Sequence, residues 1–172
     1  FYPPVEVFGS TVAIAATALL VTRTGSAPWT TVALGLASQE VSSAMREIDA
    51  NTILIGTNQG RVLRVSWSGA SWSKVQLASP ASRYISCIAV DPSNLQRFWL
   101  TLSQTGGGMV YRSDNAGGSW VNCTAGLPSI PFSSVVVDPA NFQRVWVAAD
   151  VGVYQTLGLG SSWGAFSNGL PN

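Results

Sequence analysis

The chain has 172 residues, of which 47% are hydrophobic and only 10% are charged, with a net charge of +1. This length suffices for one domain with a sizeable core, but no basic stripe is available to bind nucleic acid. Histidine is absent, which excludes Ser-His-Asp and Cys-His catalysis and most catalytic zinc sites. We expect no metal and no cofactor. Low charge with 17 Gly, 9 Pro and 7 Trp is typical of short strands joined by tight turns.

In chain order, the first apolar run covers residues 10–22. It is shorter than the roughly 20 residues of a membrane helix, so we predict two buried strands and no membrane span. Residues 85–102 and 132–149 match without a gap, and 41–57 is a shorter version. Each alternates apolar and small residues, turns, and resumes as a β-rich run. The last repeat predicts strands near 132–137, 145–149, 152–156 and 163–167.

Four tryptophans mark a longer period: Trp29, Trp72, Trp120 and Trp163 are 43, 48 and 43 residues apart. Gly-Leu-Pro, or a degenerate form of it, follows each. Four short strands in every 40 to 50 residues indicate a β-propeller blade, whereas a β-sandwich needs no such period. We predict an all-β fold, a β-propeller segment of about four blades with four antiparallel strands each. The approximate blades are 1–36, 37–80, 81–128 and 129–172.

The first predicted blade is incomplete, because only "FYPPVEV" precedes its match to the other repeats and no inner strand is evident. Propellers are normally closed into a ring, since open sheet edges invite wrong pairing. We therefore expect either the remaining blades of a larger propeller or another protein chain as a partner.

The stretch "SDNAGGSW", residues 113–120, resembles the Asp-box or BNR repeat, Ser/Thr-x-Asp/Asn-x-Gly-x-x-Trp. This resemblance implies a family of propellers that includes sialidases, xyloglucanases, the sortilin-type receptor domain and a photosystem II assembly factor. Its members share a fold and differ in function. The matching residues are Ser113, Asn115, Gly117 and Trp120, then Thr156, Gly160 and Trp163, then Gly69 and Trp72, and in the first repeat Thr22 and Trp29.

We predict a structural role for these boxes, as connections between the third and fourth strands of each blade. Ser113 and Asn115 can hydrogen-bond nearby backbone N–H groups, and Gly117 can supply a positive φ. Trp120 then begins the outer strand and buries its ring beneath the turn. A ligand role for Asn115 is the alternative, but a turn already accounts for each residue type.

The resemblance places the active site of related enzymes on the face opposite the boxes. There, the loops between second and third strands and the links between blades carry a candidate binding face: Asn58, Gln59, Arg83, Tyr84, Gln104 and Asp150. Asp150 matches a catalytic aspartate of xyloglucanases. Glycoside hydrolysis usually needs two carboxylates about 5 to 10 Å apart, and no partner acid is evident. Arg97 and Arg144 occupy equivalent repeat positions, which argues against a sialidase arginine cluster.

The two cysteines, Cys87 and Cys123, fall on the first and fourth strands of one blade. Three strand spacings, about 14 Å, separate them, so we predict two unpaired thiols. Asn122-Cys123-Thr124 fits the glycosylation pattern.

Two functions remain open. One is a non-catalytic scaffold or binding module in an extracellular or periplasmic assembly, with a glycan or protein as ligand. The alternative is a fragment of a xyloglucanase-like hydrolase whose second carboxylate lies on other blades. The sparse acids favour the first.

Overall fold

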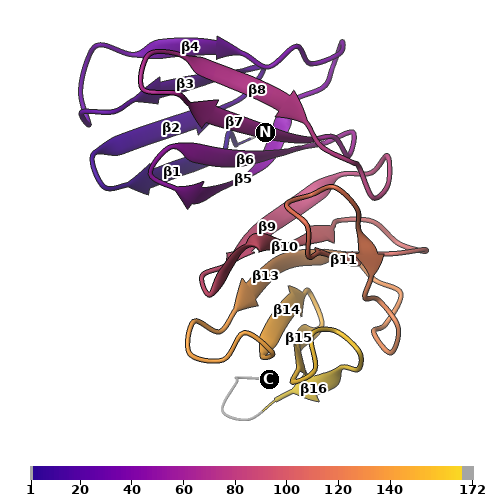
Figure 1. Ribbon diagram of the computed structural model, residues 1–172. Helices are drawn as coiled ribbons and strands as arrows, with labels where there is room; N and C mark the ends of the chain where they lie inside the picture. The colour runs from indigo at the N-terminus through magenta and orange to yellow at the C-terminus, as the bar shows by residue number, and fades with distance from the viewer. Residues whose placement is uncertain (1, 168–172) are drawn as a thin grey trace.

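The computed structural model describes residues 2–167 and consists of four antiparallel sheets, each with four strands in chain order (Figure 1). We call them blades 1 to 4 and their strands A to D. Blade 1 contains β1 (Val5–Phe8), β2 (Thr11–Ala15), β3 (Ala18–Thr22) and β4 (Thr30–Ala33); blade 2 contains β5 (Ser42–Asp49), β6 (Thr52–Thr57), β7 (Val62–Trp67) and β8 (Trp72–Gln76). Blade 3 contains β9 (Ile85–Asp91), β10 (Asn94–Leu102), β11 (Val110–Ser113) and β12 (Val121–Asn122); blade 4 contains β13 (Phe132–Val137), β14 (Val145–Ala149), β15 (Gly152–Thr156) and β16 (Gly164–Phe166).

The architecture confirms the predicted all-β propeller segment of four blades. The apolar run 10–22 forms β2 and β3, and the strands expected at 132–137, 145–149 and 152–156 are β13, β14 and β15. Strand alternation explains the sequence pattern, because successive side chains point to opposite sheet faces. In β2 the side chains of Val12 and Ile14 are partly exposed, whereas those of Ala13 and Ala15, which alternate with them, are completely buried.

The expectation of an incomplete first blade is wrong. Residues 5–8 form β1, which pairs with β2 from Val5 and Ile14 to Phe8 and Thr11. Gly9, with φ of 57°, begins the two-residue turn between them. An antiparallel ladder uses backbone groups, so β1 forms without the sequence features that the other inner strands share.

The hydrophobic core lies between neighbouring blades as three clusters. One joins blades 1 and 2 through residues such as Leu19 and Ile55, a second joins blades 2 and 3 through Leu54 and Phe98, and the third joins blades 3 and 4. The third contains Trp99, which is fully buried. Neighbouring blades therefore cover the apolar faces that they turn toward each other.

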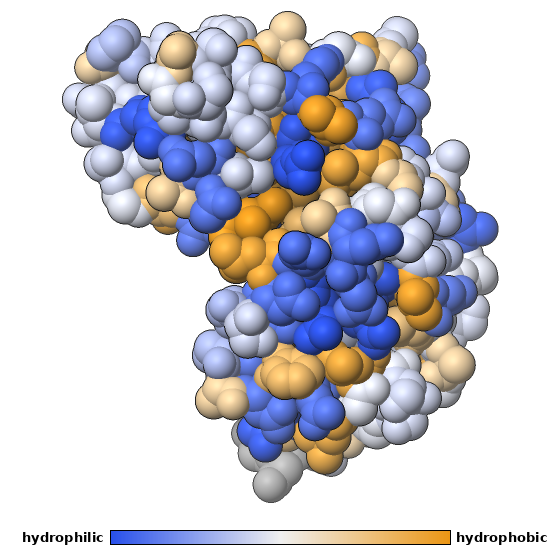
Figure 2. Space-filling view, viewed as in Figure 1, coloured by the Kyte–Doolittle hydropathy of each residue, from blue (hydrophilic) through white to orange (hydrophobic). Residues whose placement is uncertain are grey.

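The strands A of blades 2, 3 and 4 lie beside one another on the concave side of the molecule (Figure 1). The Ser43 hydroxyl of β5 donates to the carbonyl of Ile85 at 2.7 Å, and the Ser86 hydroxyl of β9 donates to that of Phe132 at 2.6 Å. This repeated bond joins each of these inner strands to the next. Figure 2 shows apolar residues gathered in the hollow between the upper and lower pairs of blades.

Cys87 and Cys123 are both free thiols, as expected from their separate strands. Burial raises the pKa of the Cys123 thiol, so this side chain behaves as a core residue. No helix long and apolar enough to cross a bilayer occurs among residues 2–167.

Candidate functional site

Two residues of the candidate binding face, Asn58 and Gln59, lie in the turn between β6 and β7. Asn58 Oδ1 accepts the Val41 N–H at 2.9 Å, and its Nδ2 donates to the Gln39 carbonyl at 3.1 Å. Gln59 Nε2 donates to the Ser38 carbonyl at 3.5 Å. Both ends of the Asn58 side-chain amide are thus hydrogen-bonded to the link between blades 1 and 2.

Arg83, Tyr84 and Gln104 come together at the next junction. Arg83, in the link between blades 2 and 3, donates through Nη1 to the Gly106 carbonyl of the β10–β11 loop. The Tyr84 carbonyl accepts the Ser103 N–H at 3.1 Å, while its side chain is 41% exposed. Gln104 is exposed on the same loop. The links between blades and the B–C loops therefore share one face, where Tyr84 and Gln104 present free side chains.

Asp150 and Glu40 are the two acids that the described residues place on this face. Glu40 is buried and ion-paired: Arg61 Nε donates to Oε1 at 2.9 Å, and the Ala37 N–H donates to Oε2 at 2.9 Å. Burial opposes its ionisation, but bonds from Ala37, Thr57 and Arg61 outweigh this and lower the pKa of Glu40. Asp150 is exposed in the β14–β15 turn of blade 4. The Glu40 carboxylate is already bonded to Arg61 and to the backbone of the link, so Glu40 and Asp150 do not form a free carboxylate pair.

The turn at 113–120 is closed by its own side chains. Ser113 Oγ accepts the Gly117 N–H at 2.9 Å, and Asn115 Oδ1 accepts the Ser119 N–H at 2.9 Å. Asn115 Nδ2 donates to Ser119 Oγ at 3.0 Å. Gly117 has φ of 82°. Because both ends of the Asn115 amide bond within the turn, little remains of it for a ligand.

The tryptophan of this turn contacts the preceding blade rather than its own outer strand alone. Trp120 Nε1 donates to the Ala78 carbonyl at 2.8 Å, and the Ala78 N–H donates to the Gly117 carbonyl at 3.1 Å. In blade 4, Trp163 Nε1 donates to the Cys123 carbonyl of blade 3 at 2.7 Å. These indoles are only half-buried, and their hydrogen bonds join blade 3 to blade 2 and blade 4 to blade 3.

The blade 4 turn repeats this geometry without an acidic residue. Thr156 Oγ1 accepts the N–H groups of Gly158 and Gly160 at 3.2 and 3.1 Å. Leu159 and Gly160 have φ of 55° and 81°, close to the values of Ala116 and Gly117 in blade 3. Gly158, where the acid is missing, leaves the turn intact, because Thr156 alone caps two donors.

The turns of blades 1 and 2 differ. Trp29 is 43% exposed and has no preceding blade among the described residues. In blade 2 a four-residue hairpin containing Gly69 joins β7 to β8, and Trp72 pairs directly across it with Trp67. Their ring centroids lie 5.4 Å apart. Neither indole N–H has a hydrogen-bond partner within residues 2–167.

A groove at these two tryptophans was missed at the sequence level. The groove has a volume of about 480 Å³ and lies between the outer strands of blades 1 and 2. Its lining residues are Thr30, Thr31, Val32, Ala33, Trp67, Ala70, Ser71, Trp72 and Lys74. The Arg23 guanidinium lies 5.3 Å from the Trp67 ring centroid, and no acid lines the groove. The available signal was that Trp67 has no counterpart in the other repeats.

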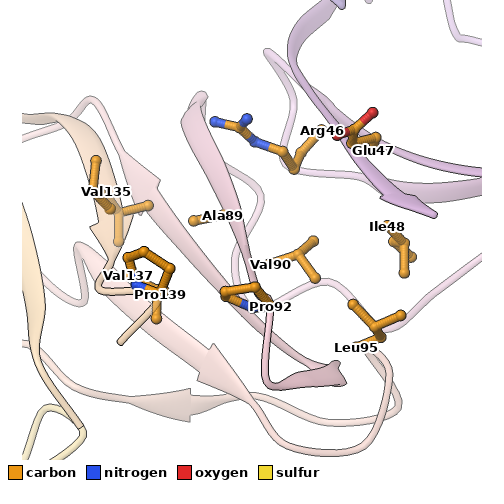
Figure 3. A pocket seen from close by; sticks show the side chains of 11 residues that line it. Arg46, Glu47, Ile48, Ala89, Val90, Pro92, Leu95, Val135, Val137 and Pro139 are labelled. Atoms are coloured by element: carbon orange, nitrogen blue, oxygen red, sulfur yellow. The ribbon is translucent and has the colours of Figure 1, made fainter. Parts of the chain in front are cut away.

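A second hollow of about 360 Å³ lies on the concave side, against the strands A of blades 2 to 4 (Figure 3). Arg46 and Glu47 on β5 face Val135, Val137 and Pro139 across it. Arg46 also pairs with Glu6 of β1 at 3.8 Å. Burial raises the pKa of Glu6, and the Glu47 charge adds to this against the opposing Arg46. This hollow is mainly apolar, with its charges at one side.

Arg97, in the first half of β10, and Arg144, just before β14, repeat one structural arrangement near the A–B connections. Arg97 Nη1 bonds Asp91 Oδ2 at 3.0 Å, and Arg144 Nη1 bonds Asp138 Oδ2 at 3.1 Å. Arg97 also binds Asp114, which Arg112 contacts at 2.9 Å. Each arginine is thus paired within its own repeat. Within residues 2–167 no group of side chains is arranged to hold a metal ion.

No protein-family model and no curated protein matches the sequence, but solved structures share its fold. An ancestral GH74 enzyme superposes with a TM-score of 0.76 at 20% identity, over 98% of this chain and 24% of its own. The extracellular domain BT4673 of B. thetaiotaomicron gives 0.70 at 12%, over 99% and 22%. YCF48 from Cyanidioschyzon merolae gives 0.66 at 21%, over 92% and 50%. The chain is a β-propeller segment spanning about a quarter to a half of these proteins.

Proposed function

We propose that this chain is a non-catalytic Asp-box propeller segment, a scaffold and binding module in an extracellular or periplasmic assembly. The observation that carries this proposal is that most of the acidic side chains are already held in ion pairs or hydrogen bonds within the chain. Of eight acidic residues, five form ion pairs with arginines: Glu6, Glu40, Asp91, Asp114 and Asp138. A sixth, Asp49, accepts the Asn51 N–H at 2.8 Å.

The two remaining acids are Glu47 and Asp150. Glu47 lies near the A–B end of β5, whereas Asp150 lies in a B–C turn. These positions belong to opposite faces of the propeller, so residues 2–167 do not bring together two unpaired carboxylates of the kind that glycoside hydrolysis usually requires.

The binding site that we propose is the groove at Trp67 and Trp72, with an oligosaccharide as the ligand. Indole rings offer flat apolar surfaces to the C–H faces of a sugar, and their N–H groups can bond its hydroxyls. Thr30, Thr31 and Ser71, which carry hydroxyls, line the same groove. The volume falls in the range of roughly 300 to 1,000 Å³ that is usual for ligand sites.

Binding to a panel of neutral and uronate oligosaccharides, measured by calorimetry, tests this assignment. Trp67→Ala should weaken binding of a selected glycan at least about tenfold, equivalent to 1.4 kcal/mol. Trp146→Phe, which alters an indole on blade 4, is the matched control and should leave the affinity unchanged. Equal losses in both variants, or no effect of Trp67→Ala on a glycan that binds, would overturn the groove as the site.

The second candidate is a fragment of a GH74-like glycoside hydrolase. Asp150 supports it, because this aspartate is exposed on the face where the resemblance places catalysis. Its partner carboxylate would come from blades outside the chain. Asn122, on the outer strand β12 and exposed, remains a proposed glycosylation site; peptide mass spectrometry of the secreted protein would test it.

A further inference from the structure

We propose that the groove at Trp67 and Trp72 selects an acidic oligosaccharide, and that Arg23 binds the anionic group of one of its sugars. Selection of this kind rests on the proposed function, because the groove must first bind a glycan. The groove lies between blades 1 and 2, so residues within the chain supply both of its walls.

A smaller hollow of about 160 Å³ adjoins the groove and is lined in part by the Arg23 side chain. Three residues, Thr30, Trp67 and Trp72, line both hollows, which therefore form one continuous site. Lys74 lines the larger part and Arg23 lines the smaller part. Each part thus has one cation in its lining, and no acidic residue lines either of them.

The charges of these two cations are not balanced by acids of the chain. Arg23 Nη1 donates to the Ala50 carbonyl at 3.2 Å, and Lys74 Nζ donates to a backbone carbonyl of blade 1. Among the described residues, Asp49, the neighbour of Ala50 in the sequence, forms no ion pair with Arg23. Five of the nine cationic residues do form ion pairs within residues 2–167, namely Arg46, Arg61, Arg97, Arg112 and Arg144. An anionic ligand would therefore supply a countercharge that the groove lacks.

Arg23 is half-buried and is held in place by the tryptophans of the groove. Its guanidinium carbon lies over the Trp67 ring, 5.3 Å from the centroid, and lies 6.0 Å from the Trp72 centroid. Contact with aromatic rings orders a long side chain without using its N–H groups. Within residues 2–167 only one guanidinium N–H has an acceptor, the Ala50 carbonyl. The remaining donors suit an anionic group with two or more oxygens, which a guanidinium binds through parallel hydrogen bonds.

The combination of indole rings with a positive charge distinguishes an acidic sugar from a neutral one. Indoles contact the C–H face of a sugar whether or not it is charged. A guanidinium adds a charge-assisted hydrogen bond only for a charged sugar, and partial burial reduces the screening of that bond by salt. Trp67 and Trp72 would therefore provide affinity for a glycan, and Arg23 would provide selectivity for an acidic one.

Calorimetry with an oligogalacturonide and its fully methyl-esterified form tests the proposal. The two probes have the same sugar rings, but only the first is charged. We expect the wild-type chain to bind the acid at least about tenfold more tightly than the ester. Arg23→Gln should weaken binding of the acid about tenfold and leave the affinity for the ester unchanged. Unchanged binding of the ester also establishes that the groove of this variant is intact.

Arg64→Gln is the matched control. Arg64 lies on β7, as Trp67 does, but strand alternation directs it away from Leu63 and Val65, which pack toward blade 1. It forms no ion pair among the described residues, so its loss removes the same charge from the chain without altering the groove. The affinity of this variant for the acid should stay within about twofold of wild type, because a distant charge is screened.

Two further comparisons extend the test. Added salt should weaken binding of the acid by the wild-type chain and leave binding of the ester unchanged, a readout that needs no variant. A sulfated oligosaccharide and its desulfated form tell a sulfate ester from a carboxylate as the group that Arg23 binds. Stronger binding of either charged probe than of its neutral form, lost in Arg23→Gln, supports the proposal.

Equal affinities for charged and neutral probes in both pairs would overturn the proposal, as would a loss in Arg64→Gln as large as that in Arg23→Gln. If Trp67→Ala abolishes binding of every probe while Arg23→Gln changes none, the groove remains the glycan site and only its selectivity for acids is refuted. If the probes bind independently of Trp67, or none binds, the proposed function fails and this inference fails with it.

Discussion

At the scale of single residues, charge in this chain serves mainly to hold loops. Glu40 illustrates this, since its carboxylate joins the link from blade 1 to blade 2 to Arg61 beside the B–C turn of blade 2. Its side chain is 1% exposed, whereas that of Arg61 is 28% exposed. Asp114 follows the same rule: burial opposes ionisation, but Arg97 and Arg112 lower its pKa.

Glu40→Gln should reduce the free energy of unfolding at neutral pH by about 2 kcal/mol, because the Arg61 guanidinium loses the charge of its buried partner. The folded pKa of Glu40 is lowered, so its stabilisation is fully present above the ordinary value near 4.5 and is lost as pH falls through the folded pKa. Urea unfolding at neutral and acidic pH measures this. The difference between variant and wild type should shrink in acid; a constant difference would contradict the assignment.

At the scale of elements, the C–D turns join blades as well as strands. Gly160 shows why the turn needs glycine, because a Cβ there would lie 2.8 Å from Cys123 Cβ and 3.1 Å from the Trp99 ring. Gly69, with φ of 94°, has no atom within 4 Å of such a Cβ. An alanine at either position would therefore strain the backbone, but only at position 160 would it also collide with the preceding blade.

Gly160→Ala should destabilise the protein by about 2 to 3 kcal/mol, the sum of φ strain and overpacking. Gly69→Ala should cost only about 1 kcal/mol, from strain alone. Chemical denaturation of both variants gives the comparison. Equal losses would mean that the blade 4 turn does not press on blade 3.

The strands of blade 4 could be predicted from the sequence because the repeat supplied several aligned copies of one pattern. It failed at β1, whose formation depends on backbone pairing with β2. It also missed the direction of Trp120, because a periodic tryptophan identifies a contact without saying which blade supplies the carbonyl. Trp67, unlike Trp72, has no counterpart in the other repeats, so no periodic signal pointed to the groove that these two residues line.

At the scale of the whole molecule, four blades form an arc with a concave, apolar inner side (Figure 2). Solved structures establish the fold, but include both enzymes and an extracellular domain. Fold therefore does not decide activity. The distribution of acids does bear on it: on the face that carries Asp150 the other described acid, Glu40, is ion-paired with Arg61, and Glu47 lies toward the opposite face.

Release of reducing ends from the glycan panel is the most direct test of the central claim, that the chain binds without hydrolysing. We expect the wild-type chain to release no more reducing ends than Asp150→Asn, for glycans whose binding depends on Trp67. Turnover by the wild-type protein that Asp150→Asn abolishes, with binding retained, would contradict it and establish the hydrolase.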